Sequence, residues 1–239
     1  MIGVAIPAHN EERWLAACLA AVLAAARHPA LDGEPVMVCL VLDACDDASP
    51  DVARGYASRY ADAGVLLEVM AVDARQVGAA RAAGAAALIA AGARWLAFTD
   101  ADTRVGPGWL AAQLALRADV VCGSVEVDDW SPHAANASMA QTLFARDYQD
   151  REGHRHIHGA NLGVCALAYA AAGGFSAVAC HEDVLLVRAL ELSGARFAWS
   201  ALPRVTTSAR IDARARGGFG DTLREMVAAG TSPECAEPA

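Results

Sequence analysis

The first hundred residues of this chain alternate between short apolar runs and longer helix-like segments. The apolar runs, each of strand length, cover residues 2–6, 36–42, 65–72 and 94–98, and the helical segments cover residues 11–27, 49–63 and 78–91. Strands that alternate with helices predict an α/β fold, with a doubly wound, mostly parallel sheet flanked by helices.

The rest of the chain continues without an internal repeat or an obvious linker. Helices are expected over residues 108–116, 134–149, 182–193 and 217–229, and strands over residues 119–127 and 196–199. We therefore expect one domain over residues 1–230, with a first half over about 1–105 and a second half over about 106–230. Residues 231–239 are predicted to form a flexible tail.

The charge balance limits the kinds of partner. The chain has 239 residues and a formal net charge of −9, and all 19 of its basic residues are arginine. An acidic protein is a poor candidate for nucleic-acid binding. Without lysine, neither a Schiff base nor a P-loop lysine is available. A phosphate ligand would therefore depend on a metal ion and on local arginines.

Cysteine usage and the N-terminus bear on location. The seven cysteines lack C-x-x-C spacing and lie mostly in apolar stretches, which disfavours zinc and indicates a reducing, cytoplasmic setting. The N-terminus has no signal-peptide pattern, and the uncharged run Trp14–Ala26 is too short to span a bilayer. We expect a soluble protein, with peripheral membrane contact left open.

Two aspartates follow the apolar run Trp95–Phe98, at positions 100 and 102. Ligands of open α/β sheets bind beyond the carboxyl ends of the strands. Because residues i and i+2 of an extended segment point the same way, Asp100 and Asp102 can form one hard-oxygen site for Mg²⁺ or Mn²⁺. The alternative is that one aspartate caps the helix near Trp109 and the other faces solvent.

Several short motifs follow one another along the chain, at the predicted strand ends and helix starts. They are Ile6–Glu12, Val41–Ser49, Val77–Gly84, Thr99–Asp102, Gly159–Gly163, Gly173–Phe175 and Glu182–Asp183. This ordered set, over roughly residues 2–200, resembles the family 2 glycosyltransferases, nucleotide-sugar enzymes of the GT-A fold in the nucleotide-diphospho-sugar transferase superfamily. One departure is Ala82, which stands where the family usually has asparagine.

The resemblance implies a metal-dependent hexosyltransferase that moves a sugar from a nucleoside diphosphate sugar to a small soluble or lipid-linked acceptor. It favours UDP over GDP as the donor nucleotide and Mn²⁺ or Mg²⁺ as the cofactor. Because no membrane-spanning helices follow the motifs, non-processive transfer is expected. The donor sugar, the acceptor, inversion against retention, and the oligomeric state stay open.

The resemblance also implies a donor site. Asp102 would hold the metal ion, while Asp100 would hold the ribose and a metal-bound water. Arg81 would approach the diphosphate, or instead pair with a carboxylate. Glu12, or its neighbour Glu11, would contact the nucleotide, or would only complement a helix dipole behind the N-cap Asn10. The other expected contacts are Pro7, Ala8, Asp43, Gly78 and Ala101.

A catalytic base is expected at Asp183, with Glu182 and His181 beside it. A carboxylate at this place would take the proton of the acceptor hydroxyl. Both acids could instead be ordinary residues of a first helical turn. The expected acceptor contacts are His158, Gly159, Ala160, Asn161 and Arg210.

Two further clusters have alternative interpretations. One cluster is His154, His156 and His158, whose side chains would share a face in an extended segment. Three histidines on one strand cannot all reach a single ion. A loop that binds the acceptor is therefore preferred over a metal site or a solvated loop. Some family members take a third metal ligand from a later histidine, and none follows His181 here. The arginines of residues 207–219 (Arg210, Arg214 and Arg216) would bind phosphate or an anionic acceptor, or would be solvated.

Two other functions fit parts of the pattern. The run Asp100–Thr103 also matches the nucleophile motif of haloacid-dehalogenase-like phosphatases, although that motif normally lies on an early strand and needs a later lysine. A non-catalytic nucleotide-sugar-binding protein is the second alternative. The presence of Asp100, Asp102 and Asp183 disfavours it.

Overall fold

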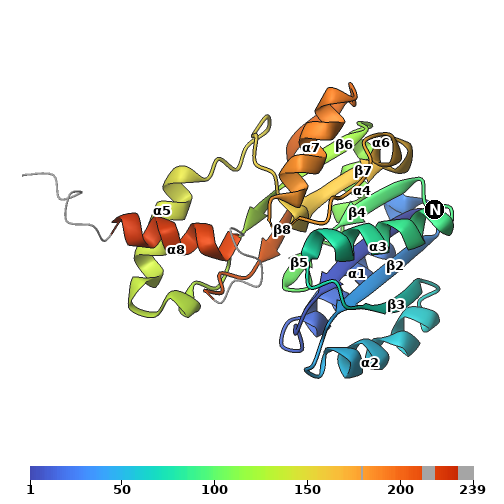
Figure 1. Cartoon of the computed structure of the whole chain (residues 1–239), viewed down its shortest axis with the longest axis horizontal. Helices are drawn as coiled ribbons and strands as arrows, with labels where there is room; N and C mark the ends of the chain where they lie inside the picture. The colour runs from blue at the N-terminus through green and yellow to red at the C-terminus, as the bar shows by residue number, and fades with distance from the viewer. Residues whose placement is uncertain (179, 212–218, 231–239) are drawn as a thin grey trace, which may run out of the picture.

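A computed structural model describes residues 1–178, 180–211 and 219–230, which form a mixed α/β molecule on one eight-stranded sheet (Figure 1). The strands are β1 (Ile2–Ala8), β2 (Val36–Asp43), β3 (Leu66–Val72), β4 (Trp95–Phe98), β5 (Thr103–Val105), β6 (Val120–Glu126), β7 (Leu162–Cys165) and β8 (Phe197–Thr207). Their order across the sheet is β3-β2-β1-β4-β7-β6-β8-β5. Strands β7 and β5 pair antiparallel with their neighbours, and the other pairings are parallel.

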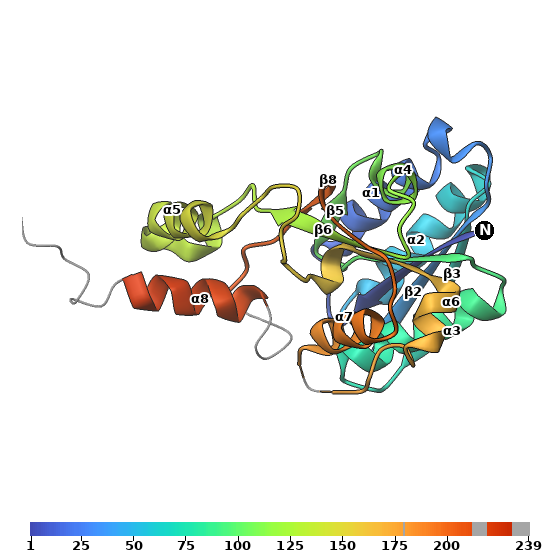
Figure 2. The same cartoon turned by 90° about the horizontal axis from the view of Figure 1, so that it is seen from above.

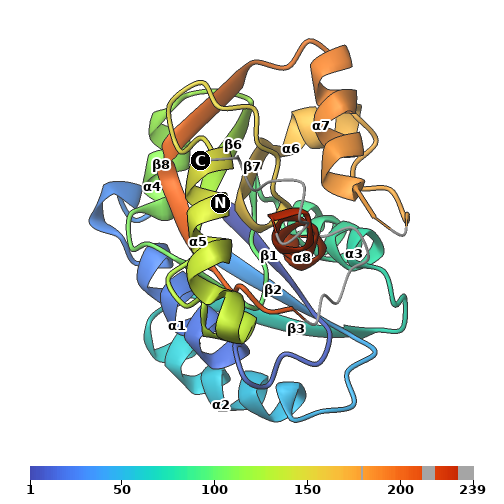
Figure 3. The same cartoon turned by 90° about the vertical axis from the view of Figure 1, so that its left-hand side faces the viewer.

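Helices cover both faces of the sheet, as the alternating pattern predicts (Figures 1 and 3). The helices are α1 (Leu15–Ala26), α2 (Ser49–Asp62), α3 (Val77–Ala90), α4 (Trp109–Ala115), α5 (Ala137–Asp147), α6 (Ala166–Ala171), α7 (Glu182–Leu192) and α8 (Phe219–Gly230), with short 3-10 helices at Pro29–Leu31, Ser131–Asn136 and Gly159–Asn161. One apolar cluster joins α1, α2 and α4 to the sheet, and a second joins α3, α6 and α7 to the opposite face. The predicted fold class is confirmed.

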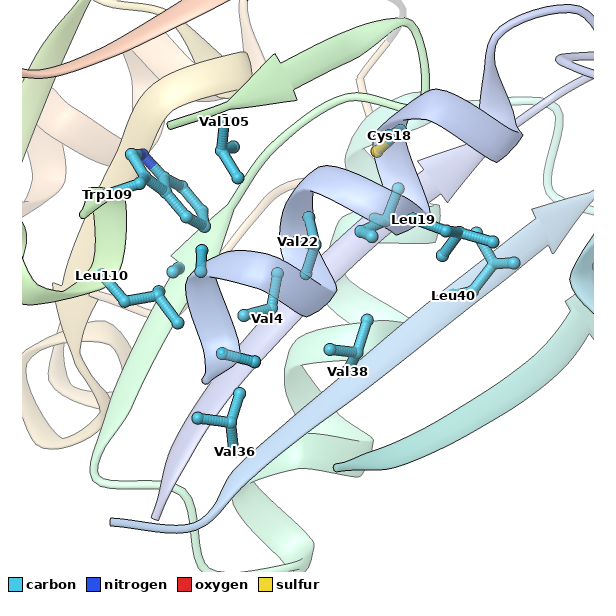
Figure 4. Packing of buried hydrophobic residues seen from close by; sticks show 14 of the residues in the cluster. Val4, Cys18, Leu19, Val22, Val36, Val38, Leu40, Val105, Trp109 and Leu110 are labelled. Atoms are coloured by element: carbon cyan, nitrogen blue, oxygen red, sulfur yellow. The ribbon is translucent and has the colours of Figure 1, made fainter. Parts of the chain in front are cut away.

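The α1 cluster shows how strand alternation builds this core (Figure 4). Val4 and Val38 point from β1 and β2 toward Leu19 and Val22 on α1, and all four side chains are fully buried. Burial of such side chains stabilises the fold by about 1.5–3 kcal/mol each. This apolar packing fixes β1, β2 and β4 side by side, so their carboxyl ends lie at one edge of the sheet.

Helices α5 and α8 lie side by side and project away from the sheet (Figures 1 and 2). Their contact is a third, smaller apolar cluster of Trp130, Ala140, Ala209, Leu223 and Val227. We call these two helices the α5–α8 arm. No helix within the described ranges combines the length and apolarity needed to span a membrane.

The start of α1 differs from the prediction. Helix α1 begins at Leu15, and Asn10 has a left-handed backbone (φ 56°) instead of acting as its N-cap. The reason is tertiary: the Asn10 side chain exchanges hydrogen bonds with Asp46, and Glu12 accepts a hydrogen bond from the backbone N–H of Ala48. These polar residues tie the end of β1 to the loop after β2.

Other differences are local. Ser49 begins α2, and its hydroxyl accepts a hydrogen bond from the Glu11 backbone N–H, which ties α2 to the segment before α1. Strand β8 continues through Pro203 to Thr207, well past the predicted end at residue 199. The short elements β5, β7 and α6 were not predicted, since three to six residues carry too little periodicity. The predicted tail, residues 231–239, lies outside the described residues.

Candidate active site

A cavity of about 850 Å³ opens at the carboxyl edge of β1, β2 and β4, a volume suited to a small-molecule ligand. One wall consists of the strand ends and the start of α7, and the other comes from the α5–α8 arm and residues 156–160. The predicted site residues that line it are Pro7, Ala8, Asp43, Arg81, Asp100, Ala101, Asp102, His158, Gly159, Ala160, His181, Glu182, Asp183 and Arg210.

Four predicted contacts lie outside the cavity lining: Asn10, Glu12, Gly78 and Asn161. Asn10 and Glu12 bind the loop after β2. Gly78 lets α3 approach the loop before α7, where a Cβ would overlap the carbonyl oxygen of Ser176. Asn161 is fully buried, donates to the carbonyls of Ser124 and Pro203, and accepts from the Trp109 indole. The contacts that the structure shows for these four residues are thus within the protein.

Asp43 ends β2 and is held by backbone groups. Its Oδ1 accepts hydrogen bonds from the N–H groups of Ala74 (2.7 Å) and Arg75 (2.8 Å), and its Oδ2 accepts one from Gln76 (3.0 Å). Asp43 thereby fixes the segment that leads into α3. The carboxylate is 4 % exposed yet lies on the cavity wall, so its position is fixed before any ligand binds.

Arg81 of α3 joins the two halves of the site. One guanidinium nitrogen donates to Asp100 (2.5 Å) and another donates to Glu182 at the start of α7. Burial lowers the pKa of Arg81, but the three surrounding carboxylates Asp100, Glu182 and Asp183 outweigh it and raise the pKa overall. The salt-bridge alternative for Arg81 is thus what the structure contains, with two partners.

Residues that directly follow β8 contact Asp102. Its Oδ2 accepts from the Ser208 hydroxyl (2.6 Å) and lies 3.2 Å from Nε of Arg210. Arg210 also donates to both carboxylate oxygens of Glu11, at 2.7 and 2.8 Å. Burial raises the pKa of Asp102, Arg210 opposes that shift, and the charge of Asp100 adds to it. Arg214 and Arg216 of the predicted basic cluster lie outside the described residues.

The D-x-D carboxylates fit a divalent cation. Their negative field reaches Cys18, where burial, followed by Asp102, Asp100 and Glu11, raises the pKa of the thiol. Two carboxylates one residue apart offer the oxygen ligands that a hard cation binds, although in this structure their charge partners are Arg81 and Arg210. Within the described ranges, no group of three or more His, Cys, Asp or Glu side chains could hold a metal ion.

Asp183 lies in the first turn of α7 and lines the same cavity. Its Oδ2 accepts a hydrogen bond from the Gly159 N–H (2.8 Å), and its Oδ1 accepts one from Val184 (2.8 Å). His181 precedes the helix with a left-handed backbone (φ 60°), a conformation that costs free energy in a non-glycine residue. This turn directs the carboxylate toward the start of the short helix Gly159–Asn161.

Aromatic rings from α5 and α8 pack against the histidine segment, a contact that was not predicted. Tyr148 stacks on Phe144 of α5 (ring centroids 4.7 Å apart) and on His156 (4.1 Å), while Phe219 of α8 meets Phe144 edge to face (5.9 Å). All four side chains line the cavity. The only local signal was Phe144 and Tyr148, four residues apart in a helical pattern.

Comparisons with known proteins agree with this architecture. The sequence model described as glycosyl transferase family 2 matches residues 3–168. Among solved structures, TarS 1–349 of S. aureus matches with a TM-score of 0.63 and 14 % identity, over 95 % of this chain and 69 % of that one. The mannosyltransferase PcManGT from Pyrobaculum calidifontis, in complex with GDP-Man and Mn²⁺, matches with a TM-score of 0.65 and 17 % identity, over 89 % and 58 %.

GalNAc-T7, solved with UDP, GalNAc and Mn²⁺, matches with a TM-score of 0.63 and 15 % identity, over 95 % of this chain and 47 % of that one. At such low identities the structures share the fold. This chain spans between 47 % and 69 % of the length of these three proteins. No curated protein sequence matches it.

Proposed function

Because the chain belongs to glycosyl transferase family 2, we propose that it transfers a sugar from a nucleoside diphosphate sugar to a hydroxyl of an acceptor. One observation carries the proposal: Asp43, the pair Asp100 and Asp102, and Asp183 line a single cavity at the carboxyl edge of the sheet. The family resemblance favours UDP as the donor nucleotide, with GDP as the alternative. The structural relatives include complexes with each.

The donor side is the edge of β1, β2 and β4. Asp43, fixed by three backbone N–H groups, accepts hydrogen bonds from the base or ribose. Asp100 and Asp102 hold a divalent ion, which when bound neutralises charge on the leaving diphosphate. Mn²⁺ in two structural relatives supports this assignment. Arg210 pairs with Asp102 and Glu11, so we place it at the diphosphate and not at the acceptor.

The acceptor side is the start of α7. As the acceptor oxygen attacks the anomeric carbon, Asp183 takes its proton and the nucleoside diphosphate leaves. The N–H of Gly159 keeps that carboxylate oriented during the transfer. A single displacement of this kind inverts the anomeric configuration, and NMR of the product would show it.

The first experiment measures nucleoside diphosphate release from a panel of nucleotide sugars, with and without Mn²⁺. We expect release from one donor that requires the metal and falls at least about a hundredfold in Asp102→Ala. Glu68→Ala, a change on the exposed edge strand β3, is a carboxylate control outside the cavity lining.

The other outcomes are equally informative. Donor binding without release, even with added acceptors, would favour a non-catalytic nucleotide-sugar-binding protein. No binding of any donor would contradict the proposal. The phosphatase alternative has no support from the family match, and the Arg81 contact leaves Asp100 poorly placed as a free nucleophile.

A further inference from the structure

Arg210 lies between two buried carboxylates at the donor edge of the cavity. Its Nη1 donates to both carboxylate oxygens of Glu11 at 2.7 and 2.8 Å, and its Nε lies 3.2 Å from Oδ2 of Asp102. The side chains of Glu11 and Asp102 are 6 % and 10 % exposed, so solvent screens these contacts little. All three residues line the cavity. One guanidinium is thus shared by the two carboxylates.

Glu11 is the partner with a fixed backbone. Its N–H donates to the Ser49 hydroxyl at the start of α2 (2.8 Å), and its carbonyl accepts from the N–H groups of Trp14 and Leu15 (both 2.9 Å). Arg210 belongs instead to the segment that follows β8, which ends at Thr207. Glu11 therefore keeps its position when the contacts of the Arg210 side chain change.

Arg210 and a divalent ion would compete for the same oxygen of Asp102. This Oδ2 pairs with Nε of Arg210 and also accepts from the Ser208 hydroxyl at 2.6 Å. A carboxylate next to a guanidinium charge attracts a second cation less strongly. The two contacts of Arg210 use different nitrogens, so the Nε contact to Asp102 can open while the Nη1 contact to Glu11 remains.

A diphosphate can replace the contact that Arg210 loses at Asp102. Planar guanidinium groups form strong, charge-assisted pairs with phosphate oxygens. Glu11 keeps Arg210 beside Asp102, where the proposed metal ion would bring the diphosphate. Arg81 is less suited to such an exchange, because its side chain is 4 % exposed and pairs with Glu182 as well as Asp100.

We propose that Arg210 couples the binding of the divalent ion to the binding of the diphosphate. Arg210 neutralises Asp102 before the donor binds, moves to the diphosphate as the ion binds Asp102, and stays anchored to Glu11. Arg210 is then a ligand-binding residue, and Glu11 is a positioning residue that acts through Arg210. This coupling rests on the donor function proposed above, and it predicts that the ion binds weakly without nucleotide.

Binding measurements test the coupling without turnover. Mn²⁺ is titrated alone and with UDP, followed by the EPR signal of the free aqueous ion, and UDP is titrated by calorimetry at saturating Mn²⁺. In Arg210→Gln, Asp102 has no competing guanidinium, so Mn²⁺ alone should bind about five- to tenfold tighter than in the parent protein. UDP should bind about tenfold weaker, because the diphosphate has lost its arginine.

These opposite signs separate the exchange from a general effect of charge. Loss of a nearby positive charge alone would strengthen Mn²⁺ binding both with and without UDP. Arg204→Gln is the matched control, since Arg204 lies on β8 outside the cavity lining and pairs with Asp150 at 2.5 Å. Both affinities should stay within about twofold of the parent values in this variant.

Two further variants test the role of Glu11. In Glu11→Gln, Arg210 keeps only its pair with Asp102, so Mn²⁺ alone and UDP should both bind about threefold weaker. The double variant Glu11→Gln/Arg210→Gln has the net charge of the parent and leaves no buried Glu11 charge without its arginine. It should still bind Mn²⁺ alone more tightly than the parent and UDP more weakly. Circular dichroism confirms that each variant is folded at the temperature of the titrations.

Two results would overturn the coupling in a parent protein that binds UDP with Mn²⁺. The first is an affinity for Mn²⁺ alone that does not rise in Arg210→Gln or in the double variant, and the second is an unchanged UDP affinity in both. Failure of the donor function has a different signature, because the parent protein would then bind neither UDP nor nucleotide sugars at saturating Mn²⁺, and the coupling would fail with it.

Discussion

At the level of single residues, the two aspartates of the D-x-D motif differ in what surrounds them. The Asp100 side chain is about one-third exposed and pairs with the buried Arg81, whereas the Asp102 side chain is 10 % exposed. Burial raises the pKa of Asp102 above its ordinary value. Its contribution to stability is therefore present below the unfolded-state pKa and is lost as pH rises through the folded-state pKa.

Asp102→Asn should accordingly remove activity while increasing the free energy of unfolding near pH 7, by about 1 kcal/mol. The physical reason is that a buried carboxylate loses the solvation of its charge, whereas a neutral amide has no charge to solvate. Urea unfolding at pH 7.5 and at pH 3.5 checks this, since the gain should shrink at the lower pH. Asp100→Asn is the contrast: it removes a partner of buried Arg81 and should destabilise by about 2 kcal/mol. Equal changes in the free energy of unfolding in the two variants would contradict this difference between Asp100 and Asp102.

Arg81 positions the carboxylates of both halves. In Arg81→Lys, one ammonium cannot match the planar fork that reaches Asp100 and Glu182 together. We expect a loss of about 3 kcal/mol in stability and a lower kcat, with a smaller change in donor affinity. Urea unfolding and steady-state kinetics measure these quantities.

Arg94→Lys is the matched control for this test. Arg94 pairs with Glu34 on the surface, so its replacement should cost less than about 1 kcal/mol. A similar loss of stability in the two variants would show that the buried bridge has no special role.

At the level of elements, the segment of residues 154–158 behaves as a packed structure and not as a solvated loop. His154 is buried, and His156 stacks between His154 and Tyr148. Burial, followed by the nearby His156 and His154, lowers the pKa of His158 to about 3. Because the unfolded chain takes up a proton near pH 6.5 and the folded one does not, this contribution is complete above pH 6.5 and is lost as pH falls toward 3.

His158→Gln should therefore reduce the acid sensitivity of the fold. In the parent protein the free energy of unfolding should fall by up to about 1.4 kcal/mol per pH unit from this histidine between pH 6 and pH 4. The glutamine variant keeps an acceptor for the Tyr148 hydroxyl and lacks the titrating group. Urea unfolding at half-unit intervals measures both slopes. Identical slopes would show that His158 is not the group responsible.

At the level of the whole molecule, the α5–α8 arm has a small apolar cluster of its own, although Phe144, Tyr148 and Phe219 also pack against the large cluster around α1. The strand ends rest on the two large clusters of the sheet, while α5 and α8 share their own small cluster (Figure 2). Small clusters bury less apolar surface and open at lower free energy. We therefore expect the arm's own cluster to open at lower free energy than the two clusters of the sheet.

Leu223→Ala tests this separation. We expect faster amide hydrogen exchange in α5 and α8 and weaker acceptor binding, with nucleotide affinity retained, because the cavity left by the substitution lies within the arm. Leu19→Ala, in the cluster under β1, should instead destabilise the whole fold by about 2–5 kcal/mol. If Leu223→Ala also abolished nucleotide binding, the two walls would form one cooperative unit.

More of the secondary structure was predicted correctly in the first half of the chain than in the second. Residues 2–98 carry strong periodicity, so seven of their strands and helices were predicted close to their observed positions. Strand β7 and the extension of β8 were not predicted. Pairing with strands distant in the sequence stabilises them, so their local sequence pattern gives little signal. Asn10 was assigned as a cap on local grounds, and its contact with Asp46, 36 residues later, decided otherwise.

By itself the sequence determined the α/β fold, the family, and the strand-end carboxylates, because hydrophobic periodicity and ordered motifs are local properties of the chain. Only the tertiary structure decided the partners: Arg81 with Asp100 and Glu182, Arg210 with Asp102 and Glu11, and Asn161 in a buried structural role. It also brought together rings from α5, the histidine segment and α8, which are up to 75 residues apart in the chain (Phe144 to Phe219). Such contacts depend on how elements pack, and no local pattern encodes which distant side chains will meet.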